Sequence, residues 1–292
     1  MELRHVRYFL ALAEELNFTR AAARVGIAQP PFSSQIKDLE QELGTQLFHR
    51  IPQGAELTSA GLAFLSVVQV MPELAEQAAR AAKRAARGEV GALNIGFTAS
   101  SAFNAVVPRT IRAFRRAYPD VRVNLEEANS TRLVSGLDEG TLDVVFLRPN
   151  PAVAERFQLR ALSEEPLVVA LPDTHPAAAG TVVALKDIAA DPLLLFPRAV
   201  GPTLYDTIVG AFRNIGCEPS IGLSAPQIAS VINLVASAFG IALVPACMSQ
   251  LAVQGVAYRQ IDGEAPVARI ALATRRGETA SVVRNFLATA IA

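Results

Sequence analysis

The stretch "GIAQPPFSSQIKDLEQELG", Gly26 to Gly44, decides the fold of the N-terminal part of the chain. Four apolar residues recur in it at helical spacing: Phe32, Ile36, Leu39 and Leu43. This spacing predicts a helix with one buried face. Two prolines at its start suit the first helical turn, where backbone N–H groups lack intrahelical partners, and Gly44 supplies a stop. We therefore predict a helix that begins near Pro30.

Two further helices are predicted before it. The first has five apolar residues on one face: Val6, Phe9, Leu10, Ala13 and Leu16. The second is "RAAARV", with Thr19 as its expected N-cap and Gly26 as its end. About three residues separate the second helix from the third, which is the spacing of a helix-turn-helix. The segment "LFHRIPQGAELT" follows and predicts a two-stranded wing around Pro52 and Gly54.

The exposed side of the third predicted helix carries small polar residues: Ser33, Ser34, Lys37 and Gln41, with Gln29 at its start. Glutamine can bond adenine in the major groove, serine can contact base or phosphate, and the helix start favours a phosphate. Residues 1–57 hold six Lys or Arg and seven Asp or Glu, so a positive surface must come from their placement. The pattern alone leaves open a solvated face of an ordinary three-helix bundle.

A long helix is predicted next, from an N-cap at Thr58 to about Arg87. Nearly thirty residues with an apolar face exceed what a small domain can cover, so pairing with another chain is expected. Pro72 predicts a kink or break within it. The alternative is that its two halves are separate helices of a bundle.

After Gly88, short β-type runs alternate with amphipathic stretches. The β-type runs are "ALNIGF", "VRVNLEE", "LDVVFL", "PLVVAL", "PLLLF", "PSIGLS", "GIALVP" and "ARIALAT". The amphipathic stretches include 103–117, 132–139, 202–215 and 226–238. This alternation predicts an α/β domain with largely parallel sheets. About 200 residues of this texture are enough for two lobes.

The 292 residues, 51% of them hydrophobic, indicate two or three globular units. No apolar run reaches the roughly 18 to 20 residues of a membrane span, and the N-terminus mixes charged and apolar residues, unlike a signal peptide. We therefore expect a cytoplasmic location and no membrane partner. Cys217 and Cys247 are expected to be small buried side chains, with a redox pair as the alternative.

Signatures of catalysis are absent from the sequence. His5, His49 and His175 have no metal-ligand spacing, and there is no G-x-S-x-G elbow, phosphate-binding Lys loop or G-x-G-x-x-G after the first strand. Glu126 and Glu127 are adjacent, so in a strand they point to opposite faces. We expect no enzyme, no cofactor and no metal site.

The N-terminal motifs resemble those of LysR-type transcriptional regulators over residues 1–64. The matching segments are "RYFLALAEELNFTRAAARVGIAQPPFSSQI", "LEQELGTQLFHR" and "LTSAG". The Ala-Gln-Pro-Pro turn is most similar to the branch that controls aromatic-compound catabolism. More weakly, residues 91–292 resemble the family's periplasmic-binding-protein-like effector domain.

The resemblance implies an α/β chain with an all-α N-terminal part. It implies a winged helix-turn-helix over 1–58, a linker and dimerisation helix over 59–88, and a bilobal, type 2 periplasmic-binding-protein-like domain over 89–292. Lobe I would cover about 89–163 and 267–292, and lobe II about 164–266. The implied partners are double-stranded promoter DNA, a small organic-anion inducer bound between the lobes, further copies forming a homodimer and homotetramer, and RNA polymerase.

The resemblance implies, by motif position, which residues of this sequence contact DNA. These are Gln29, Pro30, Pro31, Ser33 and Ser34, with Arg50 and Thr58 at the wing and linker start; the exposed face adds Lys37. Ser34 departs from the family, which usually has Arg there. A serine cannot make the bidentate contact of Arg with guanine, a loss of about 1–3 kcal/mol in base discrimination.

The expected ligand site lies where strands give way to helices. Its candidate residues are Thr98, Ser100, Ser101, Ser130, Thr131 and Arg148 from the first lobe, and Pro202, Thr203, Leu204 and Ile228 from the second. Hydroxyls and free N–H groups at helix starts suit a carboxylate, and the second lobe supplies an apolar wall. In the resembling family, Ser100, Ser130, Thr203 and Ile228 fall at inducer-lining positions. Each serine could instead be a plain N-cap, and Arg148 a surface ion pair.

We therefore predict a LysR-type regulator that responds to a small organic anion, either an aromatic carboxylate or a ring-cleavage product. The ligand would shift the balance between two tetramer shapes. The alternatives are a regulator without ligand response, a bilobal solute-binding protein, and a lyase-type enzyme, for which no acid–base pair is evident. The sequence does not give the inducer, the operator or the sign of regulation.

Overall fold

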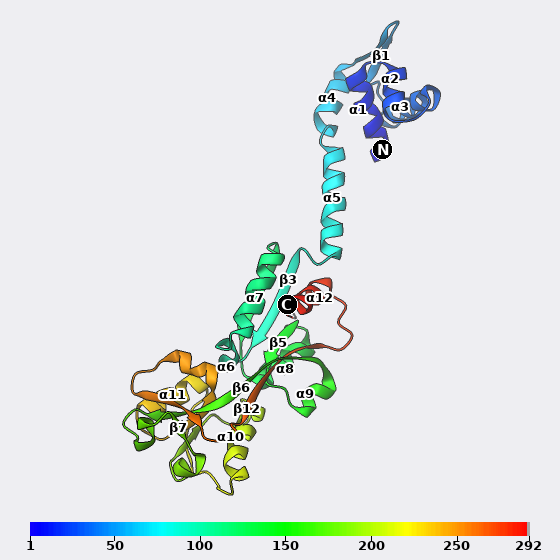
Figure 1. The fold of residues 1–292 in the computed structure, drawn as a ribbon. Helices are drawn as coiled ribbons and strands as arrows, with labels where there is room; N and C mark the ends of the chain where they lie inside the picture. The colour runs from blue at the N-terminus through cyan, green and yellow to red at the C-terminus, as the bar shows by residue number, and fades with distance from the viewer. Residues whose placement is uncertain (291–292) are drawn as a thin grey trace. The chain divides into compact units, whose positions relative to one another are not determined.

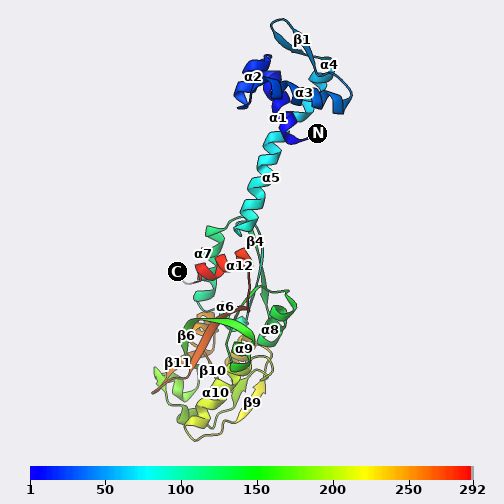
Figure 2. The same cartoon turned by 90° about the vertical axis from the view of Figure 1, so that its right-hand side faces the viewer.

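The structure is a computed structural model that describes residues 1–290, and it divides into two compact units. The first unit is Met1–Arg84 and the second is Ala85–Ala292. Figure 1 shows the first unit as helices with a small wing, and Figure 2 shows the mixed strands and helices of the second. The expected all-α N-terminal part followed by an α/β domain is confirmed.

The N-terminal unit begins with three helices, α1 (Leu3–Glu15), α2 (Phe18–Arg24) and α3 (Gln29–Leu43). Strands β1 (Phe48–Ile51) and β2 (Gly54–Leu57) pair antiparallel and form the wing. The shared core of this unit includes Val6, Phe9, Leu12, Phe32, Ile36 and Leu39. The helix-turn-helix predicted from periodicity and the wing predicted around Pro52 and Gly54 are thus confirmed.

Three local expectations in this unit were wrong. Asn17, and not Thr19, caps α2, because its side chain accepts hydrogen bonds from the backbone N–H groups of Thr19 and Arg20. Leu16 and Leu43 are 44% and 38% exposed. Leu16 is itself the left-handed residue that ends α1, and Leu43 directly precedes Gly44, the left-handed residue that ends α3. The buried face of each helix therefore ends one turn earlier.

The linker region is broken into two helices, α4 (Ser59–Val68) and α5 (Met71–Ala86), as Figure 1 shows. Thr58 caps α4 as predicted, with its Oγ1 accepting from the N–H of Gly61 at 2.9 Å. Pro72 is the second residue of α5, where its missing N–H costs no intrahelical bond. The expected break is confirmed, and a single uninterrupted helix to Arg87 is wrong.

The second unit is built on one eight-stranded sheet in the order β4-β3-β5-β12-β6-β11-β7, with β10 also paired to β6. The strands are β3 (Gly91–Phe97), β4 (Val121–Glu127), β5 (Val144–Leu147), β6 (Phe157–Pro172), β7 (Val182–Val183), β10 (Ala242–Pro245), β11 (Val256–Ile261) and β12 (Val267–Arg275). A separate parallel pair joins β8 (Leu193–Leu195) and β9 (Ile221–Ser224). All eight predicted β-type runs form strands.

One long strand, β6, passes from lobe I into lobe II, and β12 begins where the chain returns to lobe I. The first half of β6 pairs with β12, and its second half, from Leu167 on, pairs with β10 and β11. We call residues 85–166 and 267–290 lobe I, and residues 167–266 lobe II; each has its own hydrophobic core. The expectation of largely parallel sheets holds among β3, β4 and β5 and for the pairs β8–β9 and β7–β11. It is wrong for β6 and β12 and for the pairing of β10 and β11 with β6. Because β6 leads the chain out of lobe I and β12 leads it back, these strands run antiparallel.

Helices cover the sheets at nearly the expected places. They are α6 (Ala99–Ala102), α7 (Val106–Ala117), α8 (Ser130–Glu139), α9 (Pro151–Arg156), α10 (Pro202–Asn214), α11 (Ile228–Ala236) and α12 (Ser281–Thr289). The four amphipathic stretches named from the sequence correspond to α7, α8, α10 and α11. Helices α9 and α12 and strands β7 and β11 were not predicted.

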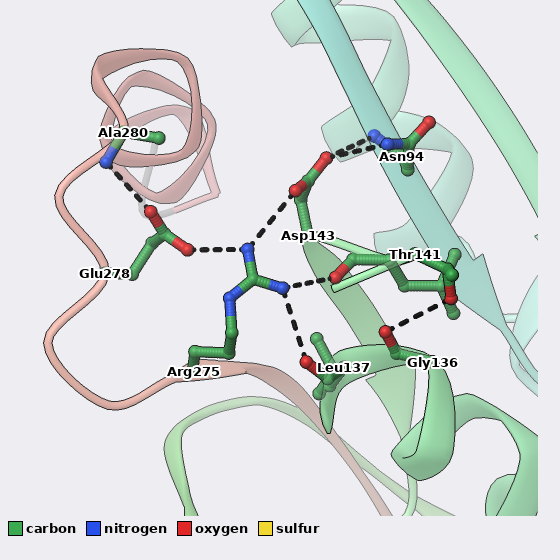
Figure 3. Close-up of polar contacts among 9 residues, drawn as sticks. Asn94, Gly136, Leu137, Thr141, Asp143, Arg275, Glu278 and Ala280 are labelled. Atoms are coloured by element: carbon green, nitrogen blue, oxygen red, sulfur yellow. Dashed lines mark hydrogen bonds and ion pairs between the residues drawn. The ribbon is translucent and has the colours of Figure 1, made fainter. Parts of the chain in front are cut away.

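Arg275, the last residue of β12, connects the end of that strand to α8 and to the start of β5 by hydrogen bonds and ion pairs, as Figure 3 shows. Its Nη1 donates to the carbonyls of Leu137 and Leu142, and its Nη2 contacts Asp143 and Glu278. Leu137 lies in the last turn of α8, so one guanidinium holds the C-terminal end of that helix. The position of α8 matters because its opposite end borders the cleft described next.

Candidate ligand cleft and DNA-binding face

A cavity of about 280 Å³ lies in the second unit. We call it the cleft; its lining residues are Thr98, Ala99, Ser100, Glu127, Ala128, Asn129, Ser130, Arg148, Phe196, Val200, Gly201, Thr203, Leu204, Pro226, Gln227 and Ile228. The lobe I residues lie at or just after the carboxyl ends of β3, β4 and β5. The lobe II residues follow β8 or begin α10 and α11. Ligands of open α/β sheets bind at such strand ends.

The two predicted serines at the cleft are not helix caps. Asn129 caps α8, with its Oδ1 accepting from the N–H of Arg132 at 2.8 Å. At α6 the turn is closed by Ser101, whose Oγ accepts from the N–H of Thr98 and donates to its carbonyl. Ser100 and Ser130 are therefore free of the capping role that was the alternative for them. Helix α6 is only four residues long, so the expected contribution of its dipole is removed.

Arg148 lies at the floor of the cleft and is only 5% exposed. Its Nη2 donates to Ser100 Oγ at 3.3 Å and lies 3.5 Å from Glu165 Oε1. Its Nε and Nη1, like Thr98 Oγ1, are buried without a hydrogen-bond partner in the described residues. Desolvation lowers the pKa of the Arg148 guanidinium, and the nearby Glu165 carboxylate opposes that shift. Arg148, for which a surface ion pair was the alternative, thus forms a buried ion pair with Glu165 and keeps two N–H donor atoms without a partner in the described residues.

Glu165 and Cys247 complete the group beneath the cleft. Glu165 is 8% exposed, and its Oε2 accepts from the backbone N–H of Cys247 at 3.0 Å. The Cys247 Sγ lies 3.5 Å from both Glu165 Oε1 and the carbonyl of Ser100. Burial, reinforced by the Glu165 charge, raises the pKa of the Cys247 thiol to about 12. A thiol that stays protonated is a poor nucleophile, which argues against the redox alternative.

The lobes also meet directly around the cleft. The N–H of Ser130 donates to Val200 O at 3.2 Å, and Thr203 Oγ1 donates to Arg148 O at 3.3 Å. Gln250 Nε2 donates to Phe103 O at 3.2 Å, which is a further bond between the lobes. These bonds hold the lobes in contact.

Of the ten predicted ligand residues, seven line the cleft: Thr98, Ser100, Ser130, Arg148, Thr203, Leu204 and Ile228. Three lie outside the lining: Ser101 closes the α6 turn, Thr131 Oγ1 donates to Ala199 O at 2.9 Å, and Pro202 opens α10. Sequence reasoning missed Glu127, Asn129 and Phe196, although Glu127 and Phe196 end predicted strands and Asn129 lies two residues after one. It also missed Glu165 and Cys247, for which the sequence offers no local signal.

The predicted DNA-contacting residues of α3 lie together at its start. Gln29 is the first residue of α3, and its Nε2 donates to Ser33 Oγ at 2.9 Å. Pro30, Pro31, Ser34 and Lys37 are exposed on the same helix, and Ser33 is half-buried. A row of small exposed polar groups on the second helix of a helix-turn-helix is available to a major groove.

The two predicted residues of the wing region are placed differently. Arg50 on β1 is exposed, and its guanidinium lies 4.9 Å from the centre of the Phe18 ring. Thr58 is half-buried; its Oγ1 donates to Gln46 O and accepts from Gly61 N. Thr58 therefore joins the wing to α4.

Many charges of the N-terminal unit are tied to one another. Arg20 and Arg24 pair with Glu14 and Glu15, and Glu40 Oε1 accepts from two backbone N–H groups at the start of β1. Arg7, Lys37 and Arg50 have no ion-pair partner within residues 1–290. Placement thus leaves a few free cations despite the balanced count.

None of the helices within residues 1–290 has the length and apolar character that a membrane crossing requires.

Comparison with known proteins adds to this geometry. Residues 3–62 match the family described as bacterial regulatory helix-turn-helix protein, lysR family, and residues 86–292 match the LysR substrate binding domain. The regulator BudR of Raoultella terrigena is 37% identical over 98% of this chain and 99% of its own length. The uncharacterized regulator YnfL of Escherichia coli K12 is 38% identical, over 98% and 96%. The crystal structure of full-length CbnR with its target DNA superposes with a TM-score of 0.85 at 29% identity, covering 100% of this chain and 99% of that one. The chain therefore belongs to the LysR family of DNA-binding transcriptional regulators.

Proposed function

We propose that the cleft binds a small organic anion and that its binding changes how α3 and the wing engage promoter DNA. One observation carries the proposal: Arg148 is 5% exposed at the cleft floor, with two nitrogens that have no partner in the described residues. Unpaired buried donors are costly and rare, so their presence at a cavity indicates a missing acceptor. A ligand carboxylate or similar oxyanion supplies one.

The body of the ligand is argued from the rest of the lining. Phe196, Leu204 and Ile228 form an apolar wall opposite the polar lobe I residues. The volume of about 280 Å³ stands at the lower end of small-molecule sites, roughly 300–1,000 Å³. An aromatic carboxylate or a compact product of ring cleavage fits this description. The protein then acts as a ligand-responsive regulator rather than as an enzyme.

DNA contact is assigned to Gln29, Pro30, Pro31, Ser33, Ser34 and Lys37 of α3, to Arg50, and to Thr58 as the support of the wing. The exposure of the α3 residues supports the assignment, as does the similarity to CbnR, which has been crystallised with its target DNA. A regulator with so few free cations needs several copies on one promoter to bind firmly.

Assembly into a homodimer and homotetramer is supported by exposed surfaces. Leu62, Val67, Val70 and Leu74 on and between α4 and α5 are at least half exposed, which is costly for a helix without a partner. Lobe I holds 14 Lys or Arg and 11 Asp or Glu, whereas lobe II holds 4 and 7. This asymmetry favours a second copy that places its lobe II against lobe I. Contact with RNA polymerase remains a prediction.

The test combines Ser100→Ala with Ser130→Ala in the full chain. A thermal-shift screen of aromatic and dicarboxylic acids on the wild type identifies stabilising acids, because a ligand stabilises the state that it binds. We expect the double variant to lose the shift while its affinity for operator DNA is unchanged in a gel-shift assay.

The matched control is Ser220→Ala with Ser249→Ala, two exposed serines of lobe II outside the cleft. It should respond to acids like the wild type. An unaltered thermal shift in the Ser100 and Ser130 variant would refute the site.

A further inference from the structure

We propose that the cleft selects monocarboxylates over dicarboxylates and that Glu165 and Glu127 enforce this selection. The inference rests on the proposed function, because it assumes that the cleft is the anion site. It narrows the ligand class: of the two chemistries that suit the lining, an acid with a single carboxylate is favoured, and diacids formed by ring cleavage are disfavoured.

The first step is the charge of the cleft floor. Arg148 is the cation among the lining residues, and the Glu165 carboxylate lies 3.5 Å from its Nη2. Glu165 is 8% exposed, so water screens it little. The floor is therefore electrically neutral before any ligand enters. One bound carboxylate already gives it a net negative charge, and a second would add to the repulsion.

The second step is the number of available donors. Nη2 of Arg148 is engaged by Ser100 and Glu165, which leaves Nε and Nη1 without a partner in the described residues. Thr98 Oγ1 is a third buried group in need of a partner. One carboxylate has two oxygens and about four acceptor positions, so it can satisfy this set by itself. Among the lining residues that the structure describes, no other side-chain atom is buried without a partner, so a second anionic group finds no comparable set of unsatisfied donors.

The third step is what the far end of the ligand would meet. Of the lining residues other than Arg148, Glu127 is the one with a charged side chain; it stands exposed at the end of β4. The rest of that wall is apolar or neutral, including Phe196, Leu204 and Gln227. A second carboxylate would therefore meet neutral side chains or another acid, and no second cation. Repulsion of the wrong ligand is as effective for selectivity as attraction of the right one.

Glu165 is also fixed in place, so it cannot swing away from a diacid. Its Oε2 accepts from the N–H of Cys247 at 3.0 Å, and the Cys247 thiol lies 3.5 Å from its Oε1. Glu165 itself sits in β6 opposite Ala268 of β12, within the strand pair that joins the lobes. The Glu165 carboxyl group is thus a fixed part of the cleft floor.

The experiment is calorimetric titration of the full chain with matched acids: benzoate against terephthalate, and hexanoate against adipate. We expect at least one monocarboxylate of these pairs to bind the wild type about tenfold more tightly than its diacid partner. Glu165→Gln should raise the affinity for the diacid about tenfold and that for the monocarboxylate less, because the removed charge repels two carboxylates of the diacid and one of the monocarboxylate. Glu127→Gln should raise it only about twofold, because this acid is exposed.

Glu165→Gln keeps an amide oxygen to accept from Cys247, and Glu127 is on the surface, so the second variant tests the idea even where the first is unstable. The matched control is Glu155→Gln on α9, an exposed acid outside the lining. It should leave the selectivity ratio as in the wild type.

The outcomes separate the two proposals. Diacids that bind as tightly as monocarboxylates, with binding lost in Ser100→Ala/Ser130→Ala, would overturn the selectivity and leave the cleft as the anion site. A selectivity ratio unchanged in both glutamine variants would overturn the roles of Glu165 and Glu127. Failure of all four acids to bind, or binding that ignores the two serines, would overturn both proposals.

Discussion

The exposed start of α3 and the floor of the cleft use similar chemistry in opposite surroundings. Each combines serine hydroxyls with a single cation, Lys37 in the first and Arg148 in the second. Lys37 stands in water without an acid partner in the described residues, whereas Arg148 is 5% exposed and pairs with a buried Glu165. They belong to different units of the chain, Lys37 to Met1–Arg84 and Arg148 to the second unit.

The difference lies in how each group responds to loss of a member. On α3, water replaces a lost partner, so each side chain contributes separately and modestly. At the cleft floor, Arg148 and Glu165 are only 5% and 8% exposed and depend on each other, since removal of one charge leaves its partner buried and unpaired. The first region should therefore tolerate substitution and tune affinity, and the second should fail as a unit.

The largest expected effect is that of Arg148→Ala. The Glu165 carboxylate would be left in a buried site without a cation, so the free energy of unfolding of the second unit should fall by about 3–5 kcal/mol. Urea denaturation followed by circular dichroism measures it. The paired replacement Arg148→Met with Glu165→Gln should recover most of the loss. A single variant as stable as the wild type would show that the floor is not a coupled group.

A smaller effect is expected of Glu40→Ala in the N-terminal unit. Glu40 Oε1 accepts from Leu47 N at 2.8 Å and Phe48 N at 3.1 Å, so its removal leaves two partly buried donors unsatisfied. The free energy of unfolding should fall by about 1–3 kcal/mol. Hydrogen exchange should show faster exchange of the wing amides. Glu40→Gln retains one acceptor oxygen and should be milder; an equal loss in both would contradict the hydrogen-bond explanation.

The same contrast explains which parts could be predicted from sequence. The three N-terminal helices, the wing and the Thr58 cap follow from periodicity and from signals within a few residues, and they are confirmed. The errors there are also local: Asn17 caps the helix in place of Thr19 because its side-chain Oδ1 accepts from the N–H groups of two successive residues, Thr19 and Arg20.

The cleft could be predicted only in part. Residues at strand-to-helix turns, such as Ser100 and Ser130, are signalled by the chain around them. Glu165 and Cys247 are not signalled in this way, because they are 82 residues apart. They meet because β10, which ends just before Cys247, pairs antiparallel with β6. A glutamate in a strand ordinarily faces solvent, and nothing near it in sequence indicates a buried arginine partner. The antiparallel course of β6 and β12 was missed for the same long-range reason.

On the exposed side, Ser34→Arg should act as a gain. The side chain of Ser34 is exposed on α3, and an arginine there can bond guanine by two N–H groups, worth about 1–3 kcal/mol of discrimination. Gel shifts with operator variants should show tighter binding or a new preference for guanine at one position. Ser34→Lys is the control, because it adds the charge without the bidentate geometry. If Ser34→Arg gives neither tighter binding nor a new preference for guanine, position 34 does not face the groove.

Gln29→Ala should cost less. The Gln29 amide already donates to Ser33 Oγ at 2.9 Å, so contact with a base exchanges one hydrogen bond for another. We expect specific operator binding to weaken by about 1 kcal/mol, roughly fivefold, with nonspecific binding unchanged. Competition gel shifts against unrelated DNA separate the two. Gln35→Ala on the same helix, where Gln35 contacts Asp38, is a suitable control. Equal operator affinity of the Gln29 variant and the wild type would remove Gln29 from base readout.

The smallest expected effect is that of alkylation at Cys247. With its thiol pKa raised to about 12, this residue carries almost no thiolate at pH 8, whereas Cys217 is partly exposed. Iodoacetamide on the native protein should therefore label Cys217 first and Cys247 only after unfolding, as mass spectrometry of peptides can show, and DNA binding should not change. Because the raised pKa favours the folded thiol, its contribution to stability is complete below the unfolded pKa, roughly 8.5, and is lost as pH rises toward 12. Labelling of Cys247 in the folded chain at pH 8 would show that the floor of the cleft opens to water. The floor of the cleft would then behave like the exposed start of α3.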